Sequence, residues 1–139
     1  MKPATAYVLD DQIGYLLRRV TQRHLAIFST AVPQVTTTQF AVIARLAELG
    51  PLSQNRLGRE TAMDAATIKG VVDRLVRQGL AATLPDAEDR RRLTVSLTDE
   101  GLAFFEATKQ TAIAISEETL SPLTPADRAI LVSLLSKLV

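Results

Sequence analysis

The chain of 139 residues lacks cysteine, and it has few aromatic residues, one histidine and no long apolar run. Without cysteine it can form no disulfide or thiolate metal site, and it cannot sense oxidants through a thiol. Because 4% of the residues are aromatic and 47% are hydrophobic, a core must consist mainly of Leu, Val, Ile and Ala. No apolar run can cross a membrane and no signal pattern opens the chain, so we expect a cytoplasmic protein.

Residues that carry catalytic chemistry are also scarce. One histidine and no cysteine leave few sets of metal ligands. No glycine-rich phosphate loop is present, and no Ser-His-Asp arrangement is suggested by position. The paired acids Asp10-Asp11 and Glu117-Glu118 fall at predicted helix ends, where a solvated role explains them. We therefore expect no enzyme, no cofactor and no metal site.

The net charge is only +1, but the charges are unevenly distributed. Residues 56–92 hold eight Lys and Arg against six Asp and Glu, whereas residues 93–139 hold three against six. A basic middle and an acidic end suit a DNA-binding protein whose ends have another role. Eight cations are also ordinary for a solvated surface, so charge alone does not decide the function.

Helical periodicity predicts two helices before the basic segment. Apolar residues recur at helical spacing from about Leu9 to Ala31. A second helix begins after Thr36, which forms a capping box with Gln39, and it ends at Gly50-Pro51.

Next comes the pattern of a helix-turn-helix. Ser53 caps a short helix that runs from Gln54 to about Glu60. Ser53 and Gln54, at the start of this helix, are candidates for binding phosphate. After a turn, Asp64 caps an amphipathic helix that ends at Gln78-Gly79. In such a unit the second helix fits the major groove of DNA.

The outward side of this second helix carries small residues and cations. Ala65 and Ala66 allow close approach to base edges, and Thr67 can bond a base or a phosphate. Lys69 and Arg74 can reach phosphates. A plain amphipathic surface helix would show the same pattern, but the neighbouring turn and hairpin favour DNA binding.

Two predicted strands, over residues 80–84 and 92–97, flank a polar hairpin tip with three consecutive arginines. The arginines repel one another, and a narrow minor groove supplies a reason for them because its negative potential attracts inserted arginine. We expect Arg91 to enter the minor groove, braced by Asp89, and Arg90 to meet a phosphate. The alternative is a solvated charged turn.

Apolar stripes also mark two C-terminal helices, one capped by Thr98 and one opened by Thr124-Pro125. With the first helix, they lie outside a compact winged-helix core, and a partner chain buries them more economically than packing within one chain. We expect a mainly α fold: a winged helix-turn-helix with a two-stranded β wing over residues 36–97, and helical dimerisation segments over 1–35 and 98–139. The C-terminal positions that need burial are Leu102, Phe105, Ile113, Ile115, Ile130, Leu134 and Leu138.

Two stretches resemble the multiple antibiotic resistance regulator (MarR) family of bacterial transcription factors. They are TQFAVIARLAELGPLSQNRLGRETAMDAATIKGVVDRLVRQGL and DAEDRRRLTVSLTDEG. With the flanking helices, the resemblance covers nearly the whole chain. Its more specific marks are Asp-x-Arg in the wing and a following Leu-Thr-x-x-Gly, matched by Asp89, Arg91, Leu97, Thr98 and Gly101. The resemblance implies an obligate homodimer that binds a palindromic DNA operator, usually as a repressor, and is released by a small, often phenolic or aromatic ligand.

His24 lies in the middle of the apolar stripe of the first helix. Either it is a core residue satisfied by a hydrogen bond, or it is a polar wall of a ligand pocket between the dimer helices and the DNA-binding lobe. With Arg18, Arg19 and Arg23 nearby, such a pocket could bind a carboxylate. The stretch DDQIGYLLRRVTQRHLAIF also resembles family members that control breakdown of aromatic or heteroaromatic acids, which implies an aromatic carboxylic acid as the small organic ligand.

Two other functions stay open at this point. A winged helix can grip a partner protein, which exposed aromatics or leucines on the second helix of the helix-turn-helix would favour. A DNA-binding protein can also be independent of any ligand. The salt dependence of DNA binding tests the first alternative, and a titration with aromatic acids tests the second.

Overall fold

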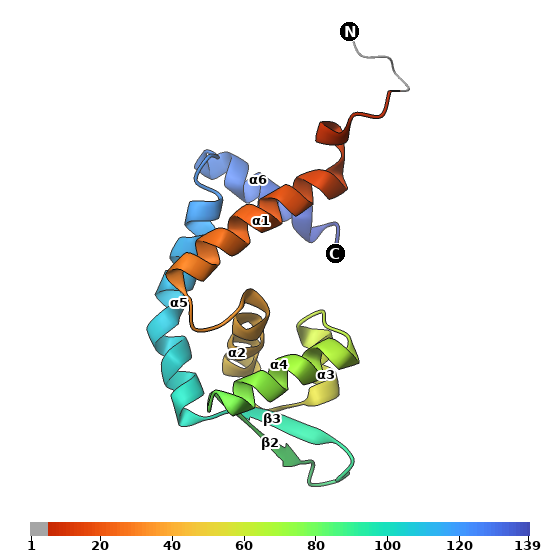
Figure 1. Cartoon of the computed structure of the whole chain (residues 1–139), viewed down its shortest axis with the longest axis vertical. Helices are drawn as coiled ribbons and strands as arrows, with labels where there is room; N and C mark the ends of the chain where they lie inside the picture. The colour runs from red at the N-terminus through yellow and green to blue at the C-terminus, as the bar shows by residue number, and fades with distance from the viewer. Residues whose placement is uncertain (1–5) are drawn as a thin grey trace. The chain divides into compact units, whose positions relative to one another are not determined.

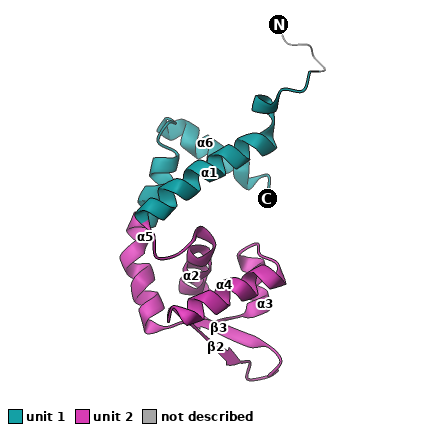
Figure 2. Ribbon diagram, viewed as in Figure 1, with its two compact units in different colours: residues 1–31, 112–139 teal, residues 32–111 magenta. Residues whose placement is uncertain are grey.

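Six α-helices, one short 3-10 helix and three short strands make up residues 6–139, the part of the chain that the computed structural model describes (Figure 1). These residues divide into two units (Figure 2). The first unit joins the N-terminal segment up to Ala31 with Ala112–Val139, and the second is Val32–Thr111. None of the described helices is long and apolar enough to cross a membrane.

The first predicted helix is interrupted near its start, so the expected beginning at Leu9 was wrong. A 3-10 helix, η1 (Leu9–Asp11), precedes α1 (Ile13–Ala31). Between them, Gln12 has extended backbone angles, and its amide side chain donates to the Val8 carbonyl at 3.1 Å. The α-helical hydrogen bonds begin only here, where the Leu16 N–H donates to the Gln12 carbonyl. Residues 1–5 of the predicted dimerisation segment lie outside the described residues.

The helices of the second unit begin where their caps predict. The hydroxyl of Thr36 accepts from the Gln39 N–H, and the Gln39 side chain accepts from the Thr36 N–H, which opens α2 (Thr37–Leu49) with the expected capping box. Ser53 accepts from the Arg56 N–H at the start of α3 (Gln54–Glu60). The cap of α4 (Ala65–Arg77) is also confirmed, as is that of α6 (Pro125–Ser136) in the first unit.

The turn between α3 and α4 is tight because of a glycine. The Met63 N–H donates to the Gly58 carbonyl at 2.8 Å. A Cβ on Gly58 would lie 3.0 Å from the Met63 carbonyl oxygen and 3.3 Å from Cγ2 of Ile68. The absence of a side chain at this position therefore lets α4 pack directly against α3.

The wing belongs to a sheet of three strands rather than two. β2 (Ala81–Pro85) and β3 (Leu93–Leu97) form the predicted antiparallel hairpin. A third strand, β1 (Leu52–Ser53), pairs with the other edge of β3, and the sheet order is β1-β3-β2. Two residues are too few to show a strand period, so sequence periodicity missed β1. The register Ser53↔Thr94 brings the start of α3 beside the wing.

The core of the second unit lies between α4, its neighbouring helices and the sheet. α4 contacts α2, α3 and β2, and the predicted inward side of α4 is buried. The buried apolar side chains of these elements are Val42, Ile43, Leu46, Leu52, Leu57, Ile68, Val71, Val72, Leu75, Ala81 and Val95.

The Leu-Thr-x-x-Gly segment joins the sheet to α5 (Asp99–Thr119) through a crossing of two chain segments. The Thr98 N–H donates to the Leu80 carbonyl at 3.1 Å, and the Thr98 hydroxyl donates to the Gly79 carbonyl at 2.6 Å. The same hydroxyl accepts from the Gly101 N–H at 3.0 Å. A Cβ on Gly101 would lie 2.0 Å from the Leu80 carbonyl oxygen. This segment is therefore explained by the close approach of backbone to backbone.

We predict that Gly101→Ala destabilises the protein by about 1–3 kcal/mol, the usual cost of overpacking a site with no room. The control is Gly70→Ala in α4, where a Cβ would meet no atom within 4 Å. That substitution should stabilise the fold by about 0.5–1 kcal/mol, because glycine is unfavourable inside a helix. Urea unfolding followed by circular dichroism measures both, and equal stability of Gly101→Ala and the wild type would contradict this account of the junction.

Candidate nucleic-acid interface

The exposed side of α4 carries the predicted DNA contacts. Ala65, Ala66 and Thr67 are exposed in its first turn. Lys69 and Arg74 are exposed further along the helix. The opposite side is buried, so the packing of α4 determines which side chains face outward. The structure thus brings these five predicted residues to one helix surface, with methyl groups at its N-terminal end and cations beyond them.

Asp64 holds the first turn of α4 in place. Its carboxylate accepts from the Thr67 N–H at 2.7 Å. This backbone hydrogen bond, reinforced by the Thr67 side chain, holds the pKa of Asp64 below its usual value. The carboxylate also interacts favourably with the positive end of the α4 dipole and stabilises the turn that presents Thr67.

Two aspartates organise the tip of the wing. Asp86 Oδ1 accepts from the N–H groups of Glu88 and Asp89, at 2.8 and 3.3 Å. Asp89 Oδ1 accepts from the Arg91 N–H at 3.0 Å and from its guanidinium Nε at 3.3 Å. The backbone bond, followed by the guanidinium bond, lowers the pKa of Asp89. The predicted brace between Asp89 and Arg91 is confirmed.

The Arg91 side chain is held at its base, yet it is 92% exposed. It can therefore enter a groove of DNA without first breaking out of the protein. Arg90 is exposed too, and it makes no ion pair with the residues that the structure describes. Arg92 lies closer to the brace, with its Nε 3.8 Å from Asp89 Oδ2.

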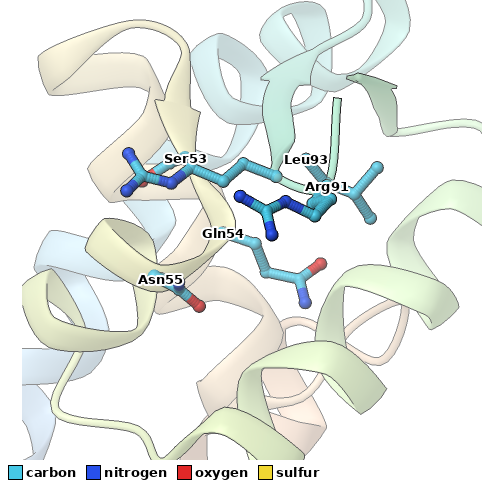
Figure 3. Close-up of a pocket in the computed structure, with 6 residues that line it drawn as sticks. Ser53, Gln54, Asn55, Arg91 and Leu93 are labelled. Atoms are coloured by element: carbon cyan, nitrogen blue, oxygen red, sulfur yellow. The ribbon is translucent and has the colours of Figure 1, made fainter. Parts of the chain in front are cut away.

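A polar hollow of about 130 Å³ lies where the wing meets the start of α3 (Figure 3). Ser53, Gln54 and Asn55 line it from one side, and Arg91 and Arg92 line it from the wing. The structure therefore joins the two predicted phosphate-binding residues to the predicted minor-groove arginine. Sequence reasoning missed Asn55 and Arg92, because only the pairing of β1 with β3 places them together.

Known proteins are similar in sequence to this chain, both over the helix-turn-helix and wing and over nearly the whole chain. The model of the MarR family matches residues 34–92. The HTH-type transcriptional repressor NicR of Pseudomonas putida is 40% identical over 137 residues, which are 97% of this chain and 87% of NicR. The chain belongs to the MarR family. It is thus a transcriptional regulator with a DNA-binding winged helix, and not an enzyme.

Solved structures of other MarR-family regulators confirm the fold. The structure of Bordetella bronchiseptica BpsR, described as regulated in DNA binding by 6-hydroxynicotinic acid, matches with a TM-score of 0.90 and 39% identity over 96% of each chain. A mutant MarR from Escherichia coli complexed with operator DNA matches with a TM-score of 0.85 and 25% identity, over 96% of this chain and 99% of that one. The mainly helical winged helix-turn-helix is therefore the fold of this MarR-family chain.

The predicted ligand contacts of this MarR-family chain all lie on α1, but they do not all converge. His24 Nδ1 lies 2.8 Å from Oγ1 of Thr119. Arg23 donates to the carbonyl of Glu118 at 2.9 Å and also to the carbonyl of Thr119. Arg23 and His24 thus lie together at the C-terminal end of α5.

The other two arginines lie earlier on α1. The guanidinium of Arg19 stands 5.9 Å from the ring centre of Tyr15, and Arg18 is exposed. The four residues therefore do not form one cluster, because Arg23 and His24 bond to the end of α5 whereas Arg19 lies over the Tyr15 ring.

We predict that Asp89→Ala weakens binding to an operator by about three- to tenfold, since an unbraced Arg91 must be ordered when it binds. The control is Glu88→Ala, which removes the same charge from the tip but leaves the bonds of Asp89 to Arg91 intact. That control should bind DNA as well as the wild type or slightly better, because it removes repulsion from phosphates. Fluorescence anisotropy with a labelled duplex measures both, and equal effects would show that the tip contributes only charge.

Proposed function

We propose that this MarR-family chain is a homodimeric repressor that binds a palindromic operator and releases it when it binds an aromatic or heteroaromatic carboxylic acid. The observation that carries the proposal is the surface of the second unit. There, a helix with small and cationic side chains lies in the same unit as a wing that presents a braced, exposed arginine.

The proposed contacts with DNA follow from the chemistry of each side chain. Major-groove base edges meet the first turn of α4, where small side chains permit close approach and a hydroxyl can bond. The minor groove receives the wing arginine, held by its aspartate. Phosphates meet the remaining cations and the start of α3. The residues are Ala65, Ala66 and Thr67 for bases; Arg91 with Asp89 for the minor groove; and Lys69, Arg74, Arg90, Ser53 and Gln54 for phosphates.

The proposed dimer rests on apolar side chains that the single chain leaves exposed. Ile13 is 62% exposed, Ile130 is 55% exposed and Leu134 is 53% exposed. Side chains of this kind are normally buried, and obligate interfaces bury about 2,000–5,000 Å². A second copy of the chain would cover them, with the terminal helices of the two copies packed together. The other exposed apolar side chains of this set are Leu16, Leu17, Val20, Leu102, Ile113 and Leu138.

Two of the residues expected in that interface, Ile115 and Phe105, are already buried or partly buried within the single chain. Ile115 is only 3% exposed. Phe105 packs against Phe40, with ring centroids 6.0 Å apart. The expectation that Ile115 needs a partner chain was therefore wrong, whereas Phe105 is only half-buried within the single chain.

The proposed ligand class rests on the side chains of α1 and on the ligand of a similar protein. BpsR is described as regulated by 6-hydroxynicotinic acid, a hydroxylated pyridine carboxylic acid, and is 39% identical to this chain. Arg18, Arg19, Arg23 and His24 offer guanidinium groups and one imidazole on a single helix. Guanidinium groups suit a carboxylate, and imidazole suits a ring hydroxyl. Such a ligand would release DNA only by favouring an arrangement of the dimer that fits the operator less well.

The test of DNA binding is selection from a random duplex library with the full chain. We expect a palindromic sequence whose affinity falls steeply with salt, with a logarithmic slope of about −0.9 for each phosphate neutralised. Arg91→Ala should weaken binding by about 1–3 kcal/mol. A protein that enriches no sequence would point instead to a protein-interaction module. Sedimentation checks the dimer, and a monomer at micromolar concentration would contradict it.

A second prediction separates sensing from folding at His24. If His24 contacts the ligand, His24→Ala should lower the affinity for a responsive pyridine carboxylic acid by about 1–3 kcal/mol, the cost of an unmet hydrogen bond. DNA affinity without the acid should change little. The matched control is Thr119→Val, which removes the protein partner of His24 but keeps the imidazole.

The two roles of His24 give different results in operator titrations with and without the acid. A ligand contact requires that His24→Ala loses the response and Thr119→Val keeps it. If both variants respond like the wild type and lose only thermal stability, His24 is a core residue. If the wild type releases DNA for no aromatic acid, the protein binds DNA independently of such ligands.

A further inference from the structure

α4 carries a single acidic residue, Asp73, on the side that faces away from the core. It is seven residues after Ala66 and four before Arg77, so these three side chains lie along one row of the helix. Asp73 is therefore in the middle of the surface proposed to face DNA. A carboxylate there opposes phosphates, and its presence requires an explanation.

The Asp73 carboxylate is oriented by one neighbour and remains accessible. Its Oδ2 lies 2.9 Å from Nζ of Lys69, one turn earlier, and its side chain is 49% exposed. Among residues 6–139, Oδ1 has no hydrogen-bond partner. Arg77 donates to the Asp73 backbone carbonyl at 3.4 Å rather than to the carboxylate. One oxygen is thus held by Lys69, and the other is free to accept a hydrogen bond from outside.

Helix stability is a weak explanation for this pair. Exposed ion pairs at this spacing contribute little. Moreover, Lys69 precedes Asp73, which is the less favourable order for a pair on a helix, because it places the cation nearer the positive end of the helix dipole. An uncharged polar residue at position 73 would serve the helix about as well and would repel DNA less.

We propose that Asp73 is a specificity-determining residue, which accepts a hydrogen bond from the exocyclic amino group of a cytosine in the major groove of the operator. This inference rests on the proposed function. A carboxylate can only accept, and cytosine N4 is the donor in the major groove that suits it. Guanine O6 and thymine O4 would face the carboxylate with acceptors, and the resulting repulsion disfavours those bases. Lys69 keeps Oδ1 directed outward by occupying Oδ2.

The same geometry weakens binding to DNA of the wrong sequence. Without the amino group, the carboxylate loses its hydration and gains no partner, while it still repels the phosphates. Lys69, paired with Asp73, has less charge to offer to a phosphate. Asp73 therefore raises the ratio of specific to non-specific affinity, although it lowers the total attraction to DNA.

The test is duplex selection with the wild-type chain, Asp73→Asn and Asp73→Ala, followed by titrations against the selected and a scrambled duplex. In the wild type, one position of each half-site should be cytosine. Asp73→Asn should change that preference to adenine, which asparagine contacts through N6 and N7. Asp73→Ala should lose the preference, and its discrimination between the two duplexes should fall about tenfold, within the range that one base contact supplies.

Glu88→Gln is the matched control, since it removes one carboxylate from the wing and none from α4. It should raise affinity for both duplexes alike and leave the selected sequence unchanged. If the two Asp73 variants select the wild-type sequence and gain affinity for both duplexes as Glu88→Gln does, Asp73 contributes only charge and the inference is overturned. If the wild type itself selects no sequence, the proposed function fails instead. Circular dichroism confirms that both Asp73 variants fold.

Discussion

The burial of one side of α4 is the constraint on which the rest of the DNA-binding lobe depends. Ile68, Val71, Val72 and Leu75 are buried, and α4 contacts α2, α3 and β2. A helix rotated about its axis would expose these side chains and lose their favourable transfer from water, about 1.5–3 kcal/mol each. Hydrophobic burial therefore decides which polar side chains of α4 point outward, and no separate interaction is needed to orient the surface proposed to face DNA.

The tip of the wing is held in a different way, because an exposed hairpin has no hydrophobic core to fix the conformation of its tip. Local hydrogen bonds from Asp86 and Asp89 replace packing there. Asp89 is also partly neutralised by Arg91, the arginine that it orients, and by Arg92. The tip thus has less net positive charge but a defined conformation, which would reduce the entropy lost if Arg91 enters a DNA groove as proposed.

Acidic and basic residues are combined in the same way on α4 and on the wing. Lys69 pairs with Asp73, and Arg91 pairs with Asp89. A surface made only of cations would bind any duplex, because phosphates dominate affinity and carry no sequence information. Carboxylates at defined positions lower that general attraction and hold the cations in one geometry. In a regulator that must find one site among many, the proposed roles of Asp73 and Asp89 would favour discrimination over affinity.

The amino-acid sequence by itself determined the order of the helices from α2 to α6 and of the two wing strands, and most of their ends, but not β1. The reason is that caps such as Thr36 with Gln39, and Asp64 with Thr67, act between residues three apart, and apolar periodicity follows the pitch of a helix. The brace of Arg91 by Asp89 was predictable for the same reason. Family resemblance covers nearly the whole chain and led to the same fold.

Only the tertiary structure decided what depends on contacts between distant residues. The pairing of β1 with β3 places Asn55 and Arg92 at one hollow. His24 has Thr119 as its partner, 95 residues away, and the Phe105 ring contacts that of Phe40. Position 101 has no room for a side chain, because the Leu80 carbonyl oxygen lies where a Cβ would be placed. Such contacts have no local period or cap to reveal them, because each forms only after the helices and strands have packed together.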